Sequence, residues 1–180
     1  MESDEGLGFR IYSDVLRVKG IRRKEKEIKD QNEIIKILKD AQYITVAMCQ
    51  ENEPYLATLS HGYDADRNCI YFHCAHEGKK IDILSENNLV WGQALKDLGY
   101  VQGACDHLFA TVQFRGRVIF VADMEEKEHA LRVMIHGLED EPERVISEQI
   151  SEKSLKRVNI GRIDIDYMSG KKAKDVIIQT

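Results

Sequence analysis

The sequence predicts a mainly β fold, in which a closed or nearly closed antiparallel barrel carries helices at its side. Apolar and β-branched residues gather in six short runs, and polar turn signals separate the first three runs by only a few residues. Connections this short join antiparallel neighbours, because parallel strands need a crossover of a dozen residues or more. Helical periodicity is confined to a few segments between the strands. A doubly wound parallel sheet is therefore disfavoured.

The elements follow from local patterns. Asp30-Gln31-Asn32-Glu33 has the form of a capping box, and the apolar spacing after it predicts a helix that ends near Asp40. Further helices are expected after Gly78, from Asp123 onward, and in a shorter segment between Pro142 and Ser154. Strands are expected over residues 43–49, 55–61, 69–73, 89–94, 108–121 and 159–167. Residues 95–106 have two glycines and no clear period, which predicts a long loop, either a surface excursion or a lid.

Length and charge limit the classes of protein. A chain of 180 residues buries about 70% of its unfolded surface on folding, enough for one core. We expect an arm-like N-terminal segment over residues 1–20 and a single domain over residues 21–180.

The net charge of −5 gives no support to nucleic-acid binding. The longest apolar run, residues 43–49, is too short to span a membrane. The acidic start does not resemble a secretory signal, so a cytoplasmic protein with free cysteines is expected.

The most informative segment has the sequence Tyr71-Phe72-His73-Cys74-Ala75-His76-Glu77-Gly78-Lys79-Lys80. An aromatic strand leads into a polar turn, and a glycine and two lysines then open a helix. The start of a helix offers free backbone N–H groups and the positive end of the helix dipole. Lysine in the first turn is unfavourable to that dipole unless an anion binds there. The pattern therefore predicts a phosphate site at Lys79 and Lys80.

Other interpretations of the polar residues remain open. Side chains alternate along a strand, so His73 and Tyr71 share one face while Cys74 shares the other with Phe72. A histidine in a strand is more often structural than catalytic, although His73 lies where the strand enters the phosphate turn. The cysteines and histidines lack the spacing of a zinc site. The basic residues between 17 and 29 form either a solvated arm, packed on the body or on a partner subunit, or a route by which Arg22 and Arg23 reach an anionic ligand.

The ordered motifs resemble one known family. Tyr71-Phe72-His73-Cys74-Ala75, followed by Glu77-Gly78-Lys79-Lys80-Ile81-Asp82-Ile83-Leu84 and Asn87-Asn88, is similar to the central motif of the nitroimidazole-resistance (Nim-type) branch of the pyridoxamine 5'-phosphate oxidase-like flavoproteins. Further segments match in the same order: Arg22-Arg23, Glu53-Pro54-Tyr55, Gly62-Tyr63, Phe114-Arg115-Gly116-Arg117 and Ser169-Gly170-Lys171. The resemblance covers roughly residues 20–172.

The resemblance implies a six-stranded antiparallel split β-barrel of the FMN-binding type, which works as a homodimer with the flavin at the subunit interface. The residues implied to line the isoalloxazine ring are Thr58, Leu59, Ser60 and His61. His73, Cys74 and Ala75 would lie beside the ribityl chain, with Lys79 and Lys80 at the phosphate. Gln113 would complete the pocket, in its own subunit or in the partner.

The resemblance also implies chemistry. The expected activity is that of a reductase or oxidoreductase, which passes electrons from NADH or NADPH to a small organic acceptor such as a nitro compound, with His73 as the candidate proton donor. Activity as a true pyridoxamine 5'-phosphate oxidase is not expected, because the only tryptophan is Trp91 and the C-terminal tryptophan and arginine motif is missing. The alternative is a non-catalytic flavin or haem-binding protein on the same barrel, which several histidines keep open.

Overall fold

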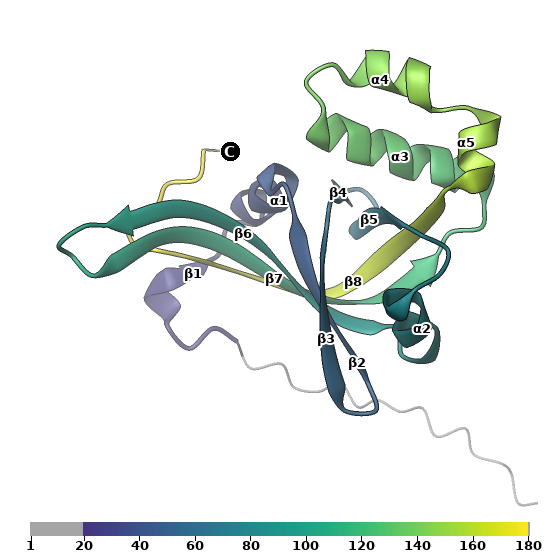
Figure 1. Ribbon diagram of the computed structural model, residues 1–180. Coiled ribbons are helices and arrows are strands. Elements are labelled where there is room, and N and C mark those ends of the chain that lie inside the picture. The colour runs from purple at the N-terminus through teal and green to yellow at the C-terminus, as the bar shows by residue number, and fades with distance from the viewer. Residues whose placement is uncertain (1–19, 180) are drawn as a thin grey trace, which may run out of the picture.

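The computed structural model describes residues 20–179, which form one curved antiparallel sheet with helices around it (Figure 1). The strands are β1 (Glu27–Ile28), β2 (Ile44–Gln50), β3 (Glu53–Leu59), β4 (Gly62–Asp64), β5 (Cys69–Cys74), β6 (Leu89–Val101), β7 (Asp106–Phe120) and β8 (Asn159–Lys172). The helices are α1 (Gln31–Asp40), α2 (Lys79–Glu86), α3 (Met124–Leu138), α4 (Pro142–Gln149) and α5 (Glu152–Arg157). Across the described part of the chain, no helix has the length and apolar character needed to cross a membrane.

The order of the strands produces a barrel that is not closed. Neighbouring strands follow the path β3-β2-β6-β7-β8-β5-β4, and β1 pairs with β8 beside this path. β3 and β4 are therefore the two ends of the sheet, yet only Ser60 and His61 separate them in the chain. The sheet must curl until its ends nearly meet, although no ladder of hydrogen bonds joins them. This is the predicted antiparallel split barrel, with eight strands where six were expected.

Two pairs of a glycine and a phenylalanine help the sheet to curve. Phe114 lies directly across from Gly92, and Phe72 lies across from Gly161. A Cβ atom on Gly92 or Gly161 would approach the opposite ring to 2.1 or 2.2 Å, so each ring occupies the space above its glycine. Both rings belong to the buried core inside the barrel, which α1 closes at one end with Ile37 and Leu38. Glycine opposite an aromatic side chain is a common means of bending a sheet.

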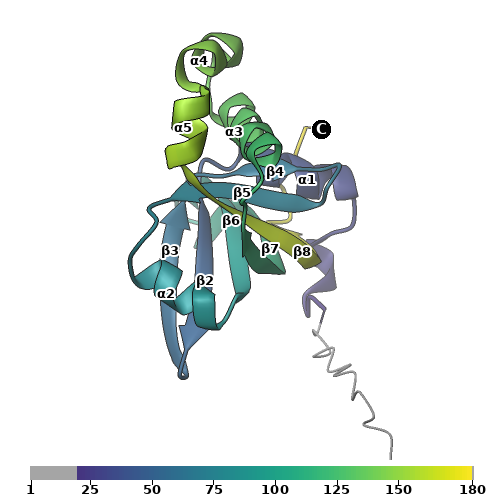
Figure 2. The same ribbon diagram turned by 90° about the vertical axis from the view of Figure 1, so that its right-hand side faces the viewer.

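A second, smaller core lies on the other side of β5 and β8. Tyr71 and Cys69 point away from the barrel interior and pack with Ile160 against α3, which contributes Ala130 and Met134. Figure 2 shows α3, α4 and α5 gathered on this side of the sheet. The alternation predicted for the strand at residues 69–73 is thus confirmed.

The predicted helix starts at Asp30 and Asp123 are confirmed, but the bond from the Glu33 side chain that would complete the predicted capping box is not formed. Asp30 caps α1 by accepting a hydrogen bond from the Asn32 N–H at 2.8 Å, and Asp123 caps α3 in the same way, with the Glu126 N–H at 2.8 Å. Residues 1–19 of the predicted arm lie outside the described residues. The segment after them packs on the body, because β1 pairs with β8.

The prediction of a loop over residues 95–106 is wrong. β6 continues to Val101 and β7 begins at Asp106, so this segment is the tip of a long hairpin. Gly99 and Gly103 have φ angles of +93° and +80°, and the strand register shifts between Asp97 and Tyr100. A bulge moves the alternation out of phase, which explains the missing period. The single helix expected between Pro142 and Ser154 is likewise two helices, since Ser151 caps α5.

Candidate functional site

The start of α2 carries two lysines held over aromatic rings. Gly78 precedes the helix with φ +124°, a conformation that favours glycine, and no side chain caps the helix. The Nζ of Lys79 lies 5.0 Å from the centre of the Tyr55 ring, and the Nζ of Lys80 lies 5.6 Å from the centre of the Phe72 ring. These contacts direct both ammonium groups toward the ends of β3 and β5. The uncapped N–H groups and the two cations thus lie together at the start of α2, an arrangement that suits an anion.

The end of β5 brings Cys74, and not His73, to the side of Lys80. Cys74 packs with Phe72 against the inner core, and burial raises the pKa of its thiol while the Lys80 ammonium opposes that shift. Asn159 donates a hydrogen bond to the Ala75 carbonyl at 3.1 Å and contacts the Cys74 sulfur at 3.6 Å. His73 is exposed on the opposite face of the strand. His73 and Cys74, which the resemblance implies beside the same ribityl chain, therefore lie on opposite faces of the strand.

A row of polar side chains crosses the outer face of the sheet. Strand register aligns Thr58, Thr45, Gln93, Gln113 and Ser169 on five consecutive strands. Gln93 donates a hydrogen bond to the Thr111 hydroxyl at 3.0 Å, and the hydroxyls of Thr45 and Thr58 lie 3.4 Å apart. The register thus brings the predicted residues Thr58 and Gln113 onto one surface, although 55 positions separate them in the chain.

A more apolar row runs beside the polar one. Its members, in the same strand order, are Leu56, Ala47, Trp91, Arg115 and Tyr167. Leu56 is 64% exposed and Trp91 is 38% exposed, and the rings of Trp91 and Tyr167 lie 5.7 Å apart. A hollow of about 310 Å³ opens on this outer face, with Gln93, Gln113 and Ser169 in its lining together with Ile21 of the basic segment. The face offers adjacent polar and apolar strips to a flat ligand.

Leu59, Ser60 and His61 do not join this outer surface. Leu59 packs against the inner core, and Ser60 and His61 form the link between the two ends of the sheet. His61 is 3% exposed, and its Nε2 lies 2.8 Å from the Leu38 carbonyl oxygen. Burial lowers the pKa of His61, while the hydrogen bond to Leu38 works against that shift. Of the four residues predicted to line one ring, only Thr58 lies on the outer face with Gln113.

Sequence analysis missed Thr45, Gln93, Ser169 and Asn159 as members of these surfaces. Each of the first three sits at an alternating position of its strand, but only the pairing register shows that they align. Asn159 meets Cys74 because β8 pairs with β5, a contact across 85 positions. No local signal in the sequence contains that information.

Comparison with known proteins identifies relatives of this arrangement. The family model for pyridoxamine 5'-phosphate oxidase matches residues 30–172, well over half of the chain. A solved protein from Bacteroides thetaiotaomicron, named for 5-nitroimidazole antibiotic resistance, is similar with 28% identity and a TM-score of 0.69, covering 81% of this chain and 86% of its own. A comparison with curated proteins found no match.

Two further solved structures share the fold. A flavocytochrome from Azotobacter vinelandii is 20% identical with a TM-score of 0.71, covering 91% of this chain and 77% of its own. An FAD-binding protein from Mesorhizobium loti is 22% identical with a TM-score of 0.57, covering 80% of this chain and 95% of its own. At these identities the similarity establishes the fold alone.

Proposed function

This chain belongs to the pyridoxamine 5'-phosphate oxidase family, and from that premise we propose that it is an FMN-binding oxidoreductase that works as a homodimer. The observation that supports the proposal most strongly is the pair of lysines at the uncapped start of α2. Their ammonium groups and the free N–H groups of the helix match the terminal phosphate of FMN.

The flavin extends from that phosphate along β3 in our proposal. The Lys79 ammonium lies over Tyr55, and Thr58 follows three residues later, a distance of about 10 Å in an extended strand. β3 is an end of the sheet, so its outward backbone groups have no partner strand among the described residues. Cys74 and Ala75, which Asn159 holds in place, would flank the ribityl chain. Thr58 and Gln113 would face the polar edge of the ring system.

The outer face supports a second copy of the chain as the cover of the ring. Leu56 and Trp91 are exposed there, side by side with the polar row. Exposed apolar side chains that adjoin one another on a surface commonly mark a contact with another protein. A symmetric dimer through this face would bury the apolar row and enclose the isoalloxazine between two sheets.

When bound, FMN supplies the redox chemistry, and the protein supplies position and electrostatics. We propose NADH or NADPH as the electron donor and a small organic compound, such as a nitroaromatic, as the acceptor. The relative named for 5-nitroimidazole antibiotic resistance supports this choice. The His73 side chain lies on the face of β5 opposite Cys74, the residue that we place beside the ribityl chain. Its role as proton donor therefore stays a prediction.

An anaerobic titration tests the proposed activity. Purified protein is loaded with FMN and reduced with NADH or NADPH, and the visible flavin absorbance is followed. Bleaching that reverses when a nitroaromatic is added is the expected result. A flavin that binds but does not bleach with either donor would instead identify a non-catalytic flavin protein. A Soret band after purification, with no flavin uptake, would favour the haem-binding alternative suggested by the flavocytochrome of the same fold.

A further inference from the structure

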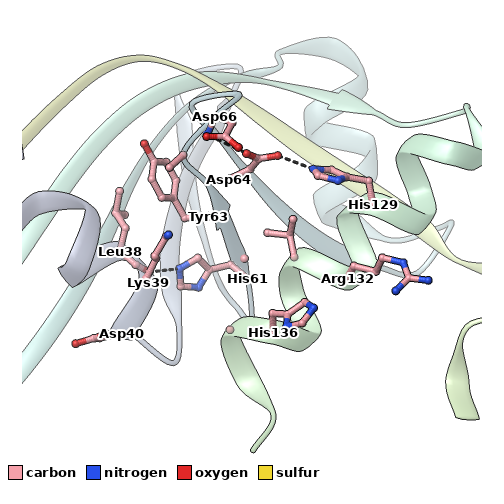
Figure 3. Close-up of a pocket in the computed structure, with 14 residues that line it drawn as sticks. Leu38, Lys39, Asp40, His61, Tyr63, Asp64, Asp66, His129, Arg132 and His136 are labelled. Carbon is pink, nitrogen blue, oxygen red and sulfur yellow. Dashed lines mark hydrogen bonds and ion pairs between the residues drawn. The ribbon is translucent and has the colours of Figure 1, made fainter. Parts of the chain in front are cut away.

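A polar cavity of about 660 Å³ lies away from the proposed flavin site (Figure 3). The end of α1, strand β4 and one face of α3 form its walls. Gly62 allows β4 and α3 to approach each other closely, because a Cβ atom at this position would lie 2.8 Å from the backbone of Met134. The cavity shares no lining residue with the start of α2 or with the polar row on the outer face. Its volume is in the range of small-molecule sites.

The cavity contains a buried hydrogen-bond acceptor without a partner. The Nε2 of His61 lies 2.8 Å from the Leu38 carbonyl oxygen, and a carbonyl can only accept, so Nε2 carries the proton of the neutral ring. The Nδ1 of His61 is then an acceptor, and no donor within the described residues reaches it. Figure 3 shows the ring projecting into the space between Asp40 and His136. A buried acceptor left unpaired is costly, so this atom points to a missing donor.

Two of the three acidic side chains that line the cavity are already paired, and the third, Asp66, is exposed. Asp40 accepts from Lys36 at 2.6 Å and from Lys96 at 2.7 Å. Asp64 accepts from His129 at 2.6 Å and from the backbone N–H groups of residues 66 and 67. These carboxylates therefore offer little further attraction to a cation.

Donor groups remain available at the mouth of the cavity. Arg132 uses its Nε and Nη2 atoms on Glu128, at 3.0 and 2.8 Å, which leaves Nη1 free of that contact. The Lys39 side chain reaches toward the gap between Tyr63 and His61 (Figure 3). Figure 3 shows Arg132 pointing away from His61, so Lys39 is the cation beside the unpaired Nδ1, and its ammonium suits a carboxylate.

We propose that this cavity binds a small carboxylic acid that carries hydroxyl groups. A hydroxyl of the ligand donates to Nδ1 of His61, and its carboxylate accepts from Lys39. Both protein groups lie on the same side of the cavity, so the ligand must carry its hydroxyl and its carboxylate on one short chain. This site is separate from the flavin and goes beyond the proposed redox function.

Two six-carbon acids provide the test. Gluconate carries hydroxyl groups along its chain and hexanoate carries none, and each is titrated by calorimetry into the full-length protein, with and without FMN. We expect gluconate to bind at one site per chain and to shift the His61 Nδ1 resonance in ¹⁵N spectra of the histidine rings. Hexanoate should bind about tenfold more weakly or worse, because it leaves Nδ1 unpaired.

Variants of the cavity provide the matched comparison. His61→Phe should abolish gluconate binding, and His107→Phe, an exposed histidine on the β6–β7 hairpin, should leave it intact. Because His61 is buried and its replacement can unfold the chain, Lys39→Gln at the exposed mouth serves as a second variant, and we expect about tenfold weaker binding. Equal affinities for both acids, absence of saturable gluconate binding, or full affinity in folded Lys39→Gln would overturn the proposal.

Discussion

Two charged clusters at the ends of β5 differ in how their groups are paired. Toward α3, Arg162 donates to Glu126 and to Asp164, and the Tyr71 hydroxyl donates to Glu126 at 3.2 Å while it accepts from Arg67 at 3.1 Å. Toward α2, Lys79 pairs with the exposed Glu53 at 3.5 Å, and the ammonium group of Lys80 lies over the face of the Phe72 ring. One cluster is complete within the chain, and the other is open.

The difference separates a structural role from a binding role. In the complete cluster, the hydrogen bond that Arg162 donates to Asp164 raises the pKa of Arg162, and burial raises the pKa of Tyr71, so both side chains are protonated at neutral pH. In the open cluster, Lys79 has only an exposed ion pair with Glu53, and no ion pair joins Lys80 to an acid among the described residues. Removing a charged partner from the complete cluster should therefore destabilise the fold, whereas removing a lysine from the open cluster should weaken ligand binding.

The largest effect on stability is expected from Glu126→Ala. This change removes one of the two carboxylates that pair with Arg162 and also the acceptor of the Tyr71 hydroxyl, and we expect the free energy of unfolding to fall by about 2–3 kcal/mol. Glu125→Ala is the matched control, because Glu125 lies in the same first turn of α3 but is exposed. Urea titration measures both variants. Equal stability of the two would show that the cluster is not structural, and loss of FMN affinity in folded Glu126→Ala would break the proposed separation of roles.

The next effect concerns the dimer. Trp91→Glu places a charge in the exposed apolar row, and we expect the homodimer to dissociate while the stability of each chain changes by less than about 0.5 kcal/mol. Analytical ultracentrifugation measures the change in mass. Leu138→Glu is the control, since Leu138 is 45% exposed on α3, away from the outer face. A dimer that survives Trp91→Glu would place the interface elsewhere.

The sequence predicted those parts of this molecule that depend on neighbours along the chain. The helix caps at Asp30 and Asp123, the helix after Gly78 and the alternation of Tyr71 and Phe72 are all local, and all are found. The outer surface depends on register across five strands, so Gln93 and Ser169 could not be recognised.

The expectation of a loop over residues 95–106 failed for a physical reason. The bulge near Asp97 shifts the alternation of side chains and so concealed the continuation of β6. His61, which the resemblance implies beside Thr58, lies where the chain passes from β3 to β4 and is buried there. Both differences occur where a strand leaves its regular geometry.

A moderate effect is expected from the pair formed by Asp64 and His129. Burial works to raise the pKa of Asp64, but the hydrogen bonds from His129 and from two backbone N–H groups outweigh it, and the pKa is lowered. A lowered pKa in the folded state stabilises the fold above the unfolded pKa of about 3.9, and this contribution is lost as the pH falls through the folded value. Asp64→Asn should therefore be less stable than the parent by about 1–2 kcal/mol at pH 7.

Urea titrations at pH 7 and in acid check this dependence. The difference between the parent protein and Asp64→Asn should narrow as the pH falls below about 4, where the parent loses the contribution of the ionised carboxylate. Asp66→Asn, an exposed neighbour, is the control and should show no such difference. A gap that stays constant with pH would mean that the ionisation of Asp64 does not stabilise the fold.

The smallest effect concerns the thiols. Burial raises the pKa of Cys69 to about 11, whereas Cys105 is exposed, so a thiol reagent should modify Cys105 rapidly and Cys69 only after unfolding. Cys74 is partly buried and lies beside Lys80, and bound FMN should slow its modification. Mass spectrometry of the labelled peptides gives the rate at each site. If FMN leaves the rate of Cys74 modification unchanged, the ribityl chain does not lie beside Cys74.

The central claim, that the open cluster at the start of α2 holds the phosphate of FMN, is tested most directly by a titration with FMN. Calorimetry compares the parent protein with Lys79→Ala/Lys80→Ala, and Lys153→Ala/Lys156→Ala on α5 serves as a control with the same loss of charge. We expect one FMN per chain in the parent and the control, and affinity lower by about 100-fold or more in the α2 variant, because two charge-assisted contacts are removed. Stoichiometric FMN bound by Lys79→Ala/Lys80→Ala with the parent's affinity would contradict the account.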